Sequence, residues 1–441
     1  MNRTARKASE TMMTINGSDQ QVPSVRALRR VRRQAILGLA LSTSIAAGCE
    51  NLDSLLAVDL PDQVVDEDLD DPALAETLVL SAQGDFECAF QAYQMVTGSW
   101  AGEIQYIHTG QYIGLIRYNT RSPLAIEYAG PCKGTGSDWR PSWTPLQLSR
   151  AEAIDAYERI QSFPEGSVTE PEYLMAKAKA YEGYSTLLLS EAFCGIVFDG
   201  DGVIQDRSVG FEAASNAFSD AIELAAQASE ADATEIASLA RVGRARARLN
   251  LGDVPGVLED IDNVPEGFVY YATYDITPDR RQSQVEQLNG EWYTVHPTFR
   301  TLEVEGVPDP RVPTEQMDRL TQTGVEWWEQ RKYADSGTDI PFASWREAQL
   351  MRAEVEGGQT AVDVINQLRA TYDLPEFHST DEQAIMDMLY EERRRELFQQ
   401  GTKMGDDLRT GRYTEWDTGI TPLGRPFGDE TCIPVPDIEL L

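Results

Sequence analysis

Apolar residues spaced three and four apart run through most of this chain, and this pattern limits the fold more than any other feature. The clearest run begins at Asp71-Pro72 and continues through Met95, with an apolar stripe made of Leu74, Leu78, Ala82, Phe86, Ala89, Tyr93 and Val96. Such spacing places these side chains on one face of an α-helix. Similar runs predict helices at about 143–162, 171–193, 210–228, 235–251, 254–263, 343–356, 360–372 and 380–400. The sequence therefore predicts a mainly α fold.

Two of these segments share a layout of helix, glycine turn and helix. The first, ARARLNLGDVPGVLEDIDNVP, begins at Ala245, and the second, MRAEVEGGQTAVDVINQLRA, begins at Met351. Aligning Ala247 with Ala353 places Gly252 on Gly358, and a residue free to take positive φ lets two antiparallel helices meet. The layout resembles the tetratricopeptide unit, so we expect tetratricopeptide-like helices at about 143–265 and 343–400. The alternative is a pair of unrelated helical hairpins.

The pattern changes between residues 264 and 342. This stretch is aromatic, Pro-rich and weakly alternating, as in GFVYYATYDITP and GEWYTVHPTFRTLEVEG. It predicts loops with short strands that lie over the helical scaffold. Long irregular insertions of this kind often carry binding surfaces. We therefore expect an irregular ligand-binding region at about 266–342.

The N-terminus carries export features. A basic run, RALRRVRR, precedes an apolar run of 13 residues, Ala35 to Ala47. A membrane-spanning helix needs roughly 20 apolar residues, so the shorter run is typical of a signal peptide. The segment that ends it, IAAGC, resembles a bacterial lipobox. We expect a lipoprotein signal peptide at 1–48, acylation of Cys49 with a tether at 49–66, and a single domain at 67–441. The alternative is a plain secretory signal that is cut nearby.

The chain is strongly acidic, with a formal net charge of −34. Residues 1–48 hold eight Lys and Arg against two Asp and Glu, which leaves 30 basic and 70 acidic residues in the rest of the chain. A field of this sign repels phosphate backbones and anionic lipid surfaces. The composition therefore argues against nucleic acid as a partner. A negatively charged protein can bind neutral ligands and attracts cationic ones.

The cysteines agree with an exported protein. Besides Cys49 the chain has Cys88, Cys132, Cys194 and Cys432, an even number that suggests two disulfides. Three pairings are possible. We favour Cys88 with Cys132, because both lie in the N-terminal third, and Cys194 with Cys432 as a long staple. No cysteine or histidine spacing matches a zinc site.

The sequence contains no recognisable catalytic motif. Its three histidines, His108, His296 and His378, lie far apart without a recognisable partner, and no nucleophile, zinc, phosphate-loop or dinucleotide motif is present. The stretch DGDG, from Asp199, lacks the rest of a calcium loop and predicts a turn. We expect no catalytic residue, no metal and no cofactor. A glycoside hydrolase, which needs a pair of carboxyl groups in a cleft, is the least favoured alternative.

One family resemblance runs along nearly the whole mature chain. YEERRRELFQQGTKMGDDLR, from Tyr390, is similar to the SusD/RagB signature, in which an ERRxEL helix leads to a Gly-His-Arg-like turn and an Asp-Leu-Arg segment. FGDETCIPVPDIE, from Phe427, resembles the terminal Pro-Ile-Pro-x-x-Glu element of the same family. Other parts fit in order: the lipobox, TGSWAGE, LMAKAKAYEGYSTLLLSEAFCG, the DPR of Asp309 to Arg311, and WREAQLMRAE. The chain departs from the pattern at Gln400, Thr402, Lys403 and Asp407.

The resemblance implies a non-enzymatic, lipid-anchored outer-membrane protein on the cell surface. Proteins of this family bind a nutrient, usually an oligosaccharide and sometimes a peptide, and deliver it to a SusC-type TonB-dependent transporter. The implied fold is a SusD-like helical superhelix with an irregular binding region. The ERRREL helix is expected to be scaffold, with its arginines paired to carboxylates and Leu389, Leu397 and Phe398 packed inward.

Aromatic rings can stack on the C–H faces of sugars, which makes exposed tryptophans in irregular segments the candidate ligand platforms. We select Trp100, Trp139 and Trp292, with the neighbouring Tyr293. The alternative for each is a packed core residue. For the whole protein, the alternative function is a periplasmic tetratricopeptide scaffold that binds proteins. Anchoring on the periplasmic side is the alternative location.

Overall fold

The computed structural model describes residues 69–108, 113–122, 142–198, 200, 202–277, 281–287, 292–321, 323–413 and 416–440. The expected signal peptide, Cys49 and the tether lie outside these residues, as do Trp139 and Cys132. Residues Asp66–Leu441 form one compact unit. None of the helices in the described ranges is both long and apolar enough to cross a membrane.

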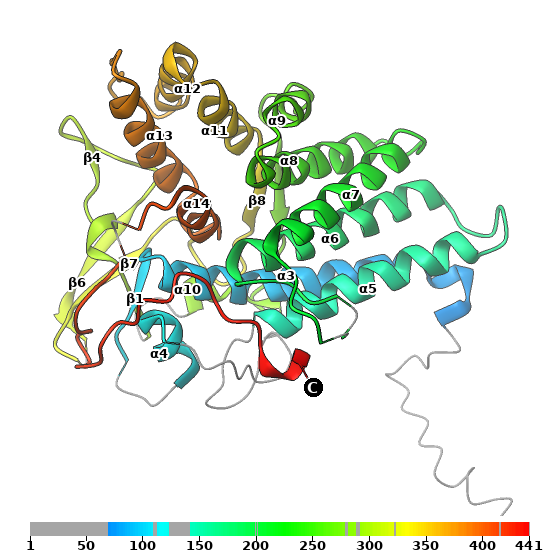
Figure 1. Cartoon of the computed structure of the whole chain (residues 1–441), viewed down its shortest axis with the longest axis horizontal. Coiled ribbons are helices and arrows are strands. Elements are labelled where there is room, and N and C mark those ends of the chain that lie inside the picture. The colour runs from blue at the N-terminus through cyan, green and yellow to red at the C-terminus, as the bar shows by residue number, and fades with distance from the viewer. Residues whose placement is uncertain are drawn as a thin grey trace, which may run out of the picture. The chain divides into compact units, whose positions relative to one another are not determined.

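The first half of the unit is helical (Figure 1). Its helices are α3 (Ala75–Trp100), α4 (Ile113–Thr120), α5 (Trp143–Ser162), α6 (Pro171–Ala192), α7 (Arg207–Ala225), α8 (Ala233–Leu251) and α9 (Val254–Ile261), and a short 3-10 turn, Pro72–Leu74, precedes α3. Helices α5 to α8 each pack on the next helix along the chain, and α3 packs on both α5 and α6. The predicted bounds match within a few residues, except that α4 was not predicted.

Helix α3 lies at the centre of this packing. Asp71 caps the preceding turn, because its side chain accepts a hydrogen bond from the backbone N–H of Ala73. Every residue of α3 from Asp85 to Trp100 is buried. A helix that is buried all round has neighbours on several sides, here α4, α5, α6, α10 and α14. The helix continues past Val96, the last residue of the predicted stripe, to Trp100.

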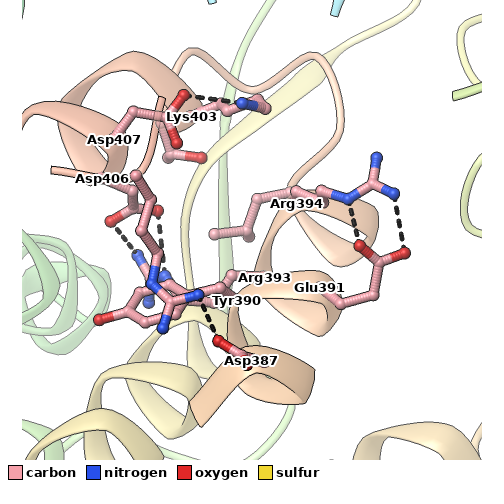
Figure 2. A pocket seen from close by; sticks show the side chains of 11 residues that line it. Asp387, Tyr390, Glu391, Arg393, Arg394, Lys403, Asp406 and Asp407 are labelled. Atoms are coloured by element: carbon pink, nitrogen blue, oxygen red, sulfur yellow. Dashed lines mark hydrogen bonds and ion pairs between the residues drawn. The ribbon is translucent and has the colours of Figure 1, made fainter. Parts of the chain in front are cut away.

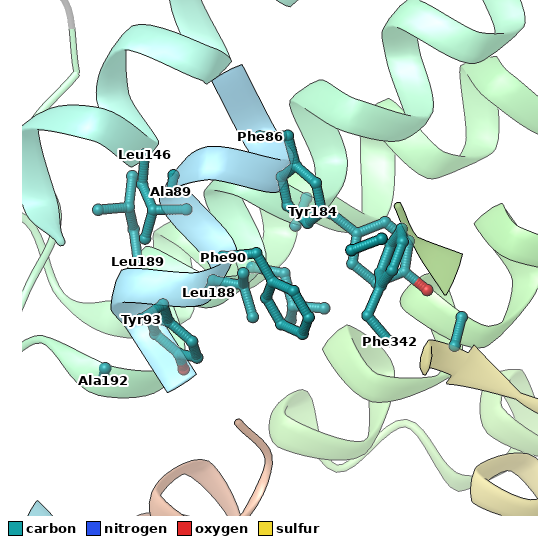
Figure 3. Close-up of a cluster of buried hydrophobic side chains, with 14 of the residues drawn as sticks. Phe86, Ala89, Phe90, Tyr93, Leu146, Tyr184, Leu188, Leu189, Ala192 and Phe342 are labelled. Carbon is teal, nitrogen blue, oxygen red and sulfur yellow. The ribbon is translucent and has the colours of Figure 1, made fainter. Parts of the chain in front are cut away.

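Aromatic side chains join α3 and α6 to the irregular region (Figure 3). Phe342 contacts the rings of Phe86, Phe90 and Tyr184, with centroid distances of 5.1, 5.6 and 4.9 Å. All four rings are at most 3% exposed. Since Phe342 belongs to strand β8 (Ile340–Ser344), this contact fixes the irregular region on the helices.

The helix-turn-helix pairs are present where the sequence predicted them. In the first pair α8 ends at Gly252, whose φ is +75°. In the second, α11 (Trp345–Glu356) ends at Gly357 with φ +64°, one residue before the Gly358 that was aligned with Gly252, and α12 (Gly358–Ala370) follows at once. The two pairs pack on each other through α11, which contacts α8 and α9. The chain continues into α13 (Glu382–Glu396) and α14 (Lys403–Thr410).

The region between α9 and α11 contains short antiparallel two-stranded sheets within its described residues. Strand β3 (Tyr293–Val295) pairs with β1 (Ile104–Tyr106), which comes from the segment between α3 and α4, and β2 (Val269–Ala272) pairs with β8. Two hairpins follow: β4 (Glu303–Val304) with β5 (Val307–Pro308), and β6 (Thr314–Leu320) with β7 (Glu326–Gln330). A short helix, α10 (Gln284–Gln287), and a 3-10 turn, Pro297–Phe299, flank β3. This matches the predicted loops with short strands.

A disulfide ties the C-terminal segment to the helices. Cys194, just after α6, is bonded to Cys432, which is the pair we favoured as a long staple. Beside it, the N–H of Cys194 donates to the carbonyl of Ile433, and the N–H of Ile433 donates to the carbonyl of Ala192. Cys88 is also disulfide-bonded, and its favoured partner, Cys132, lies outside the described residues. A last 3-10 turn spans Asp437–Leu440.

Candidate functional site

The ribbon of β1 and β3 brings two aromatic rings together from distant parts of the chain. Its register pairs Tyr106 with Tyr293, and the N–H of Ile107 donates to the carbonyl of Trp292 at 2.8 Å. The next side chains, His108 and Trp292, stack with a centroid distance of 4.2 Å and an interplanar angle of 27°. Both are half-buried. We call them the aromatic pair.

The other two rings of the ribbon hold the aromatic pair in place. Tyr106 and Tyr293 are buried and meet edge to face, with centroids 5.6 Å apart. The N–H of Tyr106 donates to the side-chain oxygen of Asn119, in α4, at 2.7 Å. Because backbone and side-chain contacts fix both strands, the aromatic pair sits on a rigid support.

Two of the residues predicted to bind ligand have a structural role instead. Trp100 is 0% exposed and Tyr293 is 3% exposed. Trp100 is buried because α3 runs on to that residue and carries it into the core. A ring without an exposed face cannot stack on a sugar, so in this structure neither residue can serve as a platform. Trp139 lies outside the described residues, and Trp292 is half-buried, so part of its ring stays accessible.

His108 was not predicted as a site residue. The sequence shows no partner for any histidine, because the partners come from distant segments that no short motif joins. His296 is a second example: it is buried, and its Nε2 lies 3.1 Å from Oδ1 of Asp417. A strand of three residues, such as β1, is too short to show a period-two pattern. Only the pairing of β1 with β3 reveals the contact.

The base of the ribbon is linked to the turn after α13 by a buried carboxyl group. Glu103 accepts a hydrogen bond from the backbone N–H of Gln399 at 3.0 Å, and its carbonyl accepts from the N–H of His296 at 3.0 Å. Burial raises the pKa of Glu103 to about 7. Glu103 is 1% exposed, so it serves as a link inside the protein and is out of reach of a ligand.

The ERRREL helix lines a pocket of about 310 Å³ with α14 (Figure 2). Arg393 donates to both oxygens of Asp406 in the neighbouring helix α14, as predicted, whereas Arg394 donates to both oxygens of Glu391 in its own helix. The other acids of this pocket, Asp387 and Asp407, pair with Arg412 and Lys403. Every carboxylate lining this pocket is thus held in an ion pair, which is the arrangement of a scaffold.

Two of the departures from the family motif compensate each other. Nζ of Lys403 lies 2.7 Å from Oδ2 of Asp407, and Nε1 of Trp416 donates to the same oxygen at 2.7 Å. Burial raises the pKa of Asp407 to about 6. A lone buried charge at either position would be costly, so the two residues depend on each other. Among the described residues, no group of His, Cys, Asp and Glu could hold a metal ion.

Comparisons with known proteins bear on the fold. No protein-family model matches the chain, and no curated protein matches it. Solved structures do match. One is surface glycan-binding protein A from Bacteroides thetaiotaomicron in complex with laminarihexaose, with a TM-score of 0.65, 10% identity, and coverage of 83% of this chain and 97% of that chain.

Two further structures give the same picture. A SusD-like protein from Bacteroides fragilis has a TM-score of 0.64 at 12% identity, and covers 86% of this chain and 96% of its own. A SusD-like carbohydrate-binding protein from Bacteroides vulgatus has a TM-score of 0.58 at 17% identity, and covers 77% of this chain and 83% of its own. The chain therefore has the SusD-like fold, as its sequence motifs predicted.

Proposed function

We propose that this protein is an outer-membrane lipoprotein on the cell surface that binds an oligosaccharide and delivers it to a SusC-type TonB-dependent transporter, without performing chemistry. The observation that carries the proposal is the half-buried aromatic pair on a rigid ribbon of a SusD-like fold. A flat apolar face favours the C–H face of a sugar. The neighbour with laminarihexaose shows that a protein of this fold binds an oligosaccharide. A peptide is the alternative ligand.

Trp292→Ala is expected to weaken oligosaccharide binding by about tenfold to a hundredfold, because it removes roughly 1.5–3 kcal/mol of aromatic burial. Binding is measured by calorimetry with the ligands that an array of neutral and acidic oligosaccharides identifies. The control is Trp328→Ala, a half-buried tryptophan of β7 that stacks with Arg300. Trp292→Phe, which keeps a ring, should retain most of the affinity. If Trp292→Ala bound the oligosaccharide as tightly as the wild type, the aromatic pair would not be part of the binding site.

The anchor and the transporter are tested together in the native cells. Under mild detergent, the acylated protein is expected to bring down a stoichiometric TonB-dependent transporter, which mass spectrometry identifies. The control is Cys49→Ala, which lacks the acylated cysteine and should leave the membrane fraction. Recovery of periplasmic proteins without a transporter would favour the alternative of a periplasmic tetratricopeptide scaffold.

A further inference from the structure

A second hollow lies between the end of α4 and the C-terminal part of the chain. It has a volume of about 260 Å³ and is lined by Ile116, Arg117, Thr120, Ser122, Arg425, Pro426, Phe427 and Gly428. We call it the α4 pocket. None of these lining residues carries a carboxylate.

The walls of the α4 pocket are held by close backbone contact. The N–H of Gly428 donates to the carbonyl of Thr120 at 2.6 Å. A Cβ at position 428 would overlap the carbonyl oxygen of Arg121, so only glycine allows this approach. The guanidinium of Arg121 lies 5.3 Å from the ring centroids of both Trp416 and Phe427, and it donates to the carbonyl of Gly428. The segment that carries Arg425 is therefore fixed on α4.

Within the described residues, the two arginines of the α4 pocket have no anionic partner. Neither Arg117 nor Arg425 forms an ion pair with a described residue. Arg117 donates through Nη1 to the carbonyl of Ser122 at 3.0 Å, while its Nε is buried and has no hydrogen-bond partner among the described residues. In a chain with 70 acidic and 30 basic residues after position 48, two guanidinium groups that pair with no described carboxylate form a local positive site in this hollow.

The remaining polar groups of the α4 pocket suit an oxygen-rich anion. The hydroxyls of Thr120 and Ser122 hydrogen-bond to each other at 2.7 Å, and the exposed hydroxyl of Ser122 can donate to a ligand when Thr120 donates to it. Guanidinium groups match the planar geometry of a carboxylate. The pocket also belongs to the same part of the molecule as the aromatic pair, since Asn119 of α4 bonds to Tyr106 of the ribbon.

We propose that the α4 pocket binds the carboxylate of a uronic acid, so that the ligand of this protein is an acidic oligosaccharide. This rests on the proposed function, because the aromatic pair supplies the stacking contact and the α4 pocket supplies the charge contact. The strongly negative chain repels anions in general, and the α4 pocket selects a ligand whose carboxylate reaches Arg117 and Arg425.

The test compares each acidic oligosaccharide with its own methyl ester, which has the same sugars and linkages but no charge. α-1,4-linked trigalacturonate and its trimethyl ester are one such pair, and uronate-containing oligosaccharides of other linkages supply more. The wild type is expected to bind its preferred acidic ligand about tenfold more tightly than the ester. This preference should shrink as salt is raised, because the charges are screened.

The variants locate the effect. Arg117→Gln and Arg425→Gln should each weaken binding of the acid several-fold and leave binding of the ester unchanged, and the double variant should bind both alike. Arg425 is exposed, so its replacement spares the fold, and Arg425→Lys should keep part of the preference. Arg241→Gln, which removes a positive charge from α8, is the matched control.

Equal binding of acid and ester by the wild type, or binding of neutral oligosaccharides alone, overturns the proposal and leaves the proposed function intact. Failure to bind any oligosaccharide overturns both.

Discussion

Glu392→Ala is expected to lower the free energy of unfolding by about 3–5 kcal/mol, because it leaves two buried arginines without their shared carboxylate. Glu392 is 0% exposed. Its Oε1 accepts from Nε and Nη2 of Arg369 at 2.8 and 2.6 Å, and its Oε2 accepts from Nη1 of Arg311. Arg311 and Arg369 are themselves 3% and 4% exposed, so water cannot replace the lost acceptor.

The position of Glu392 in the fold explains why the effect should be global. Arg311 comes from the DPR motif and also bonds to Asp309, Arg369 comes from α12, and Glu392 comes from α13. Burial alone would lower the pKa of Arg311, but its hydrogen bonds to Asp309 and the charge of Glu392 raise it instead. Residues from the DPR motif and the ERRREL helix, which lie far apart in the sequence, thus meet in one buried ion cluster.

Urea unfolding followed by circular dichroism measures the expected loss. Asp387→Ala is the matched control, because Asp387 is on the same helix but pairs with Arg412 at the exposed surface. Exposed pairs contribute about 0–1 kcal/mol, so this variant should be nearly as stable as the wild type. If Glu392→Ala lowered the free energy of unfolding by less than Asp387→Ala does, Arg311 and Arg369 would have found other partners.

The sequence predicted the helices well where tertiary contacts reinforce a long periodic pattern. Helix α5 begins at Trp143 and ends at Ser162, the predicted bounds, because one apolar face packs on α3 and α6. Helix α4 was missed: it has only eight residues, and its helical form depends on packing against α3 and β1. A short segment has too few helical turns for the spacing of its apolar residues to identify it as a helix.

The candidate site was only partly predictable for a related reason. Trp292 was selected because it lies in an irregular segment, and it is one half of the aromatic pair. Trp100 was selected on the same ground, but the pattern could not show that α3 continues to that residue or that neighbours cover it on all sides. His108 and Arg425 carry no local signal, since their roles arise from contacts between segments far apart in the chain.

Removing the disulfide between Cys194 and Cys432 is expected to lower the free energy of unfolding by about 5 kcal/mol, as the chain-entropy model gives for a loop of this length. The two cysteines are separated by 238 residues, so the bond restricts more than half of the unfolded chain. The double variant Cys194→Ala with Cys432→Ala avoids a free thiol. Chemical denaturation of this variant and the wild type measures the difference.

Removing the disulfide should also destabilise one part of the protein more than the rest, because the disulfide holds the segment that forms one wall of the α4 pocket. Without it, the segment keeps the hydrogen bond from Gly428 to Thr120, the contacts of Arg121, the backbone hydrogen bonds of Ile433 and the buried side chains of Ile433 and Val435. Because these non-covalent contacts alone then hold the segment, it should be among the first parts of the protein to open. Hydrogen exchange of residues 425–435 should therefore accelerate more than that of α6, and the preference for acidic over esterified ligand should fall.

Ile420→Ala, at a side chain that is 71% exposed in the same segment, is the control for both measurements. Unchanged exchange at 425–435 would mean that packing on α4 and α6 alone holds the C-terminal segment in place.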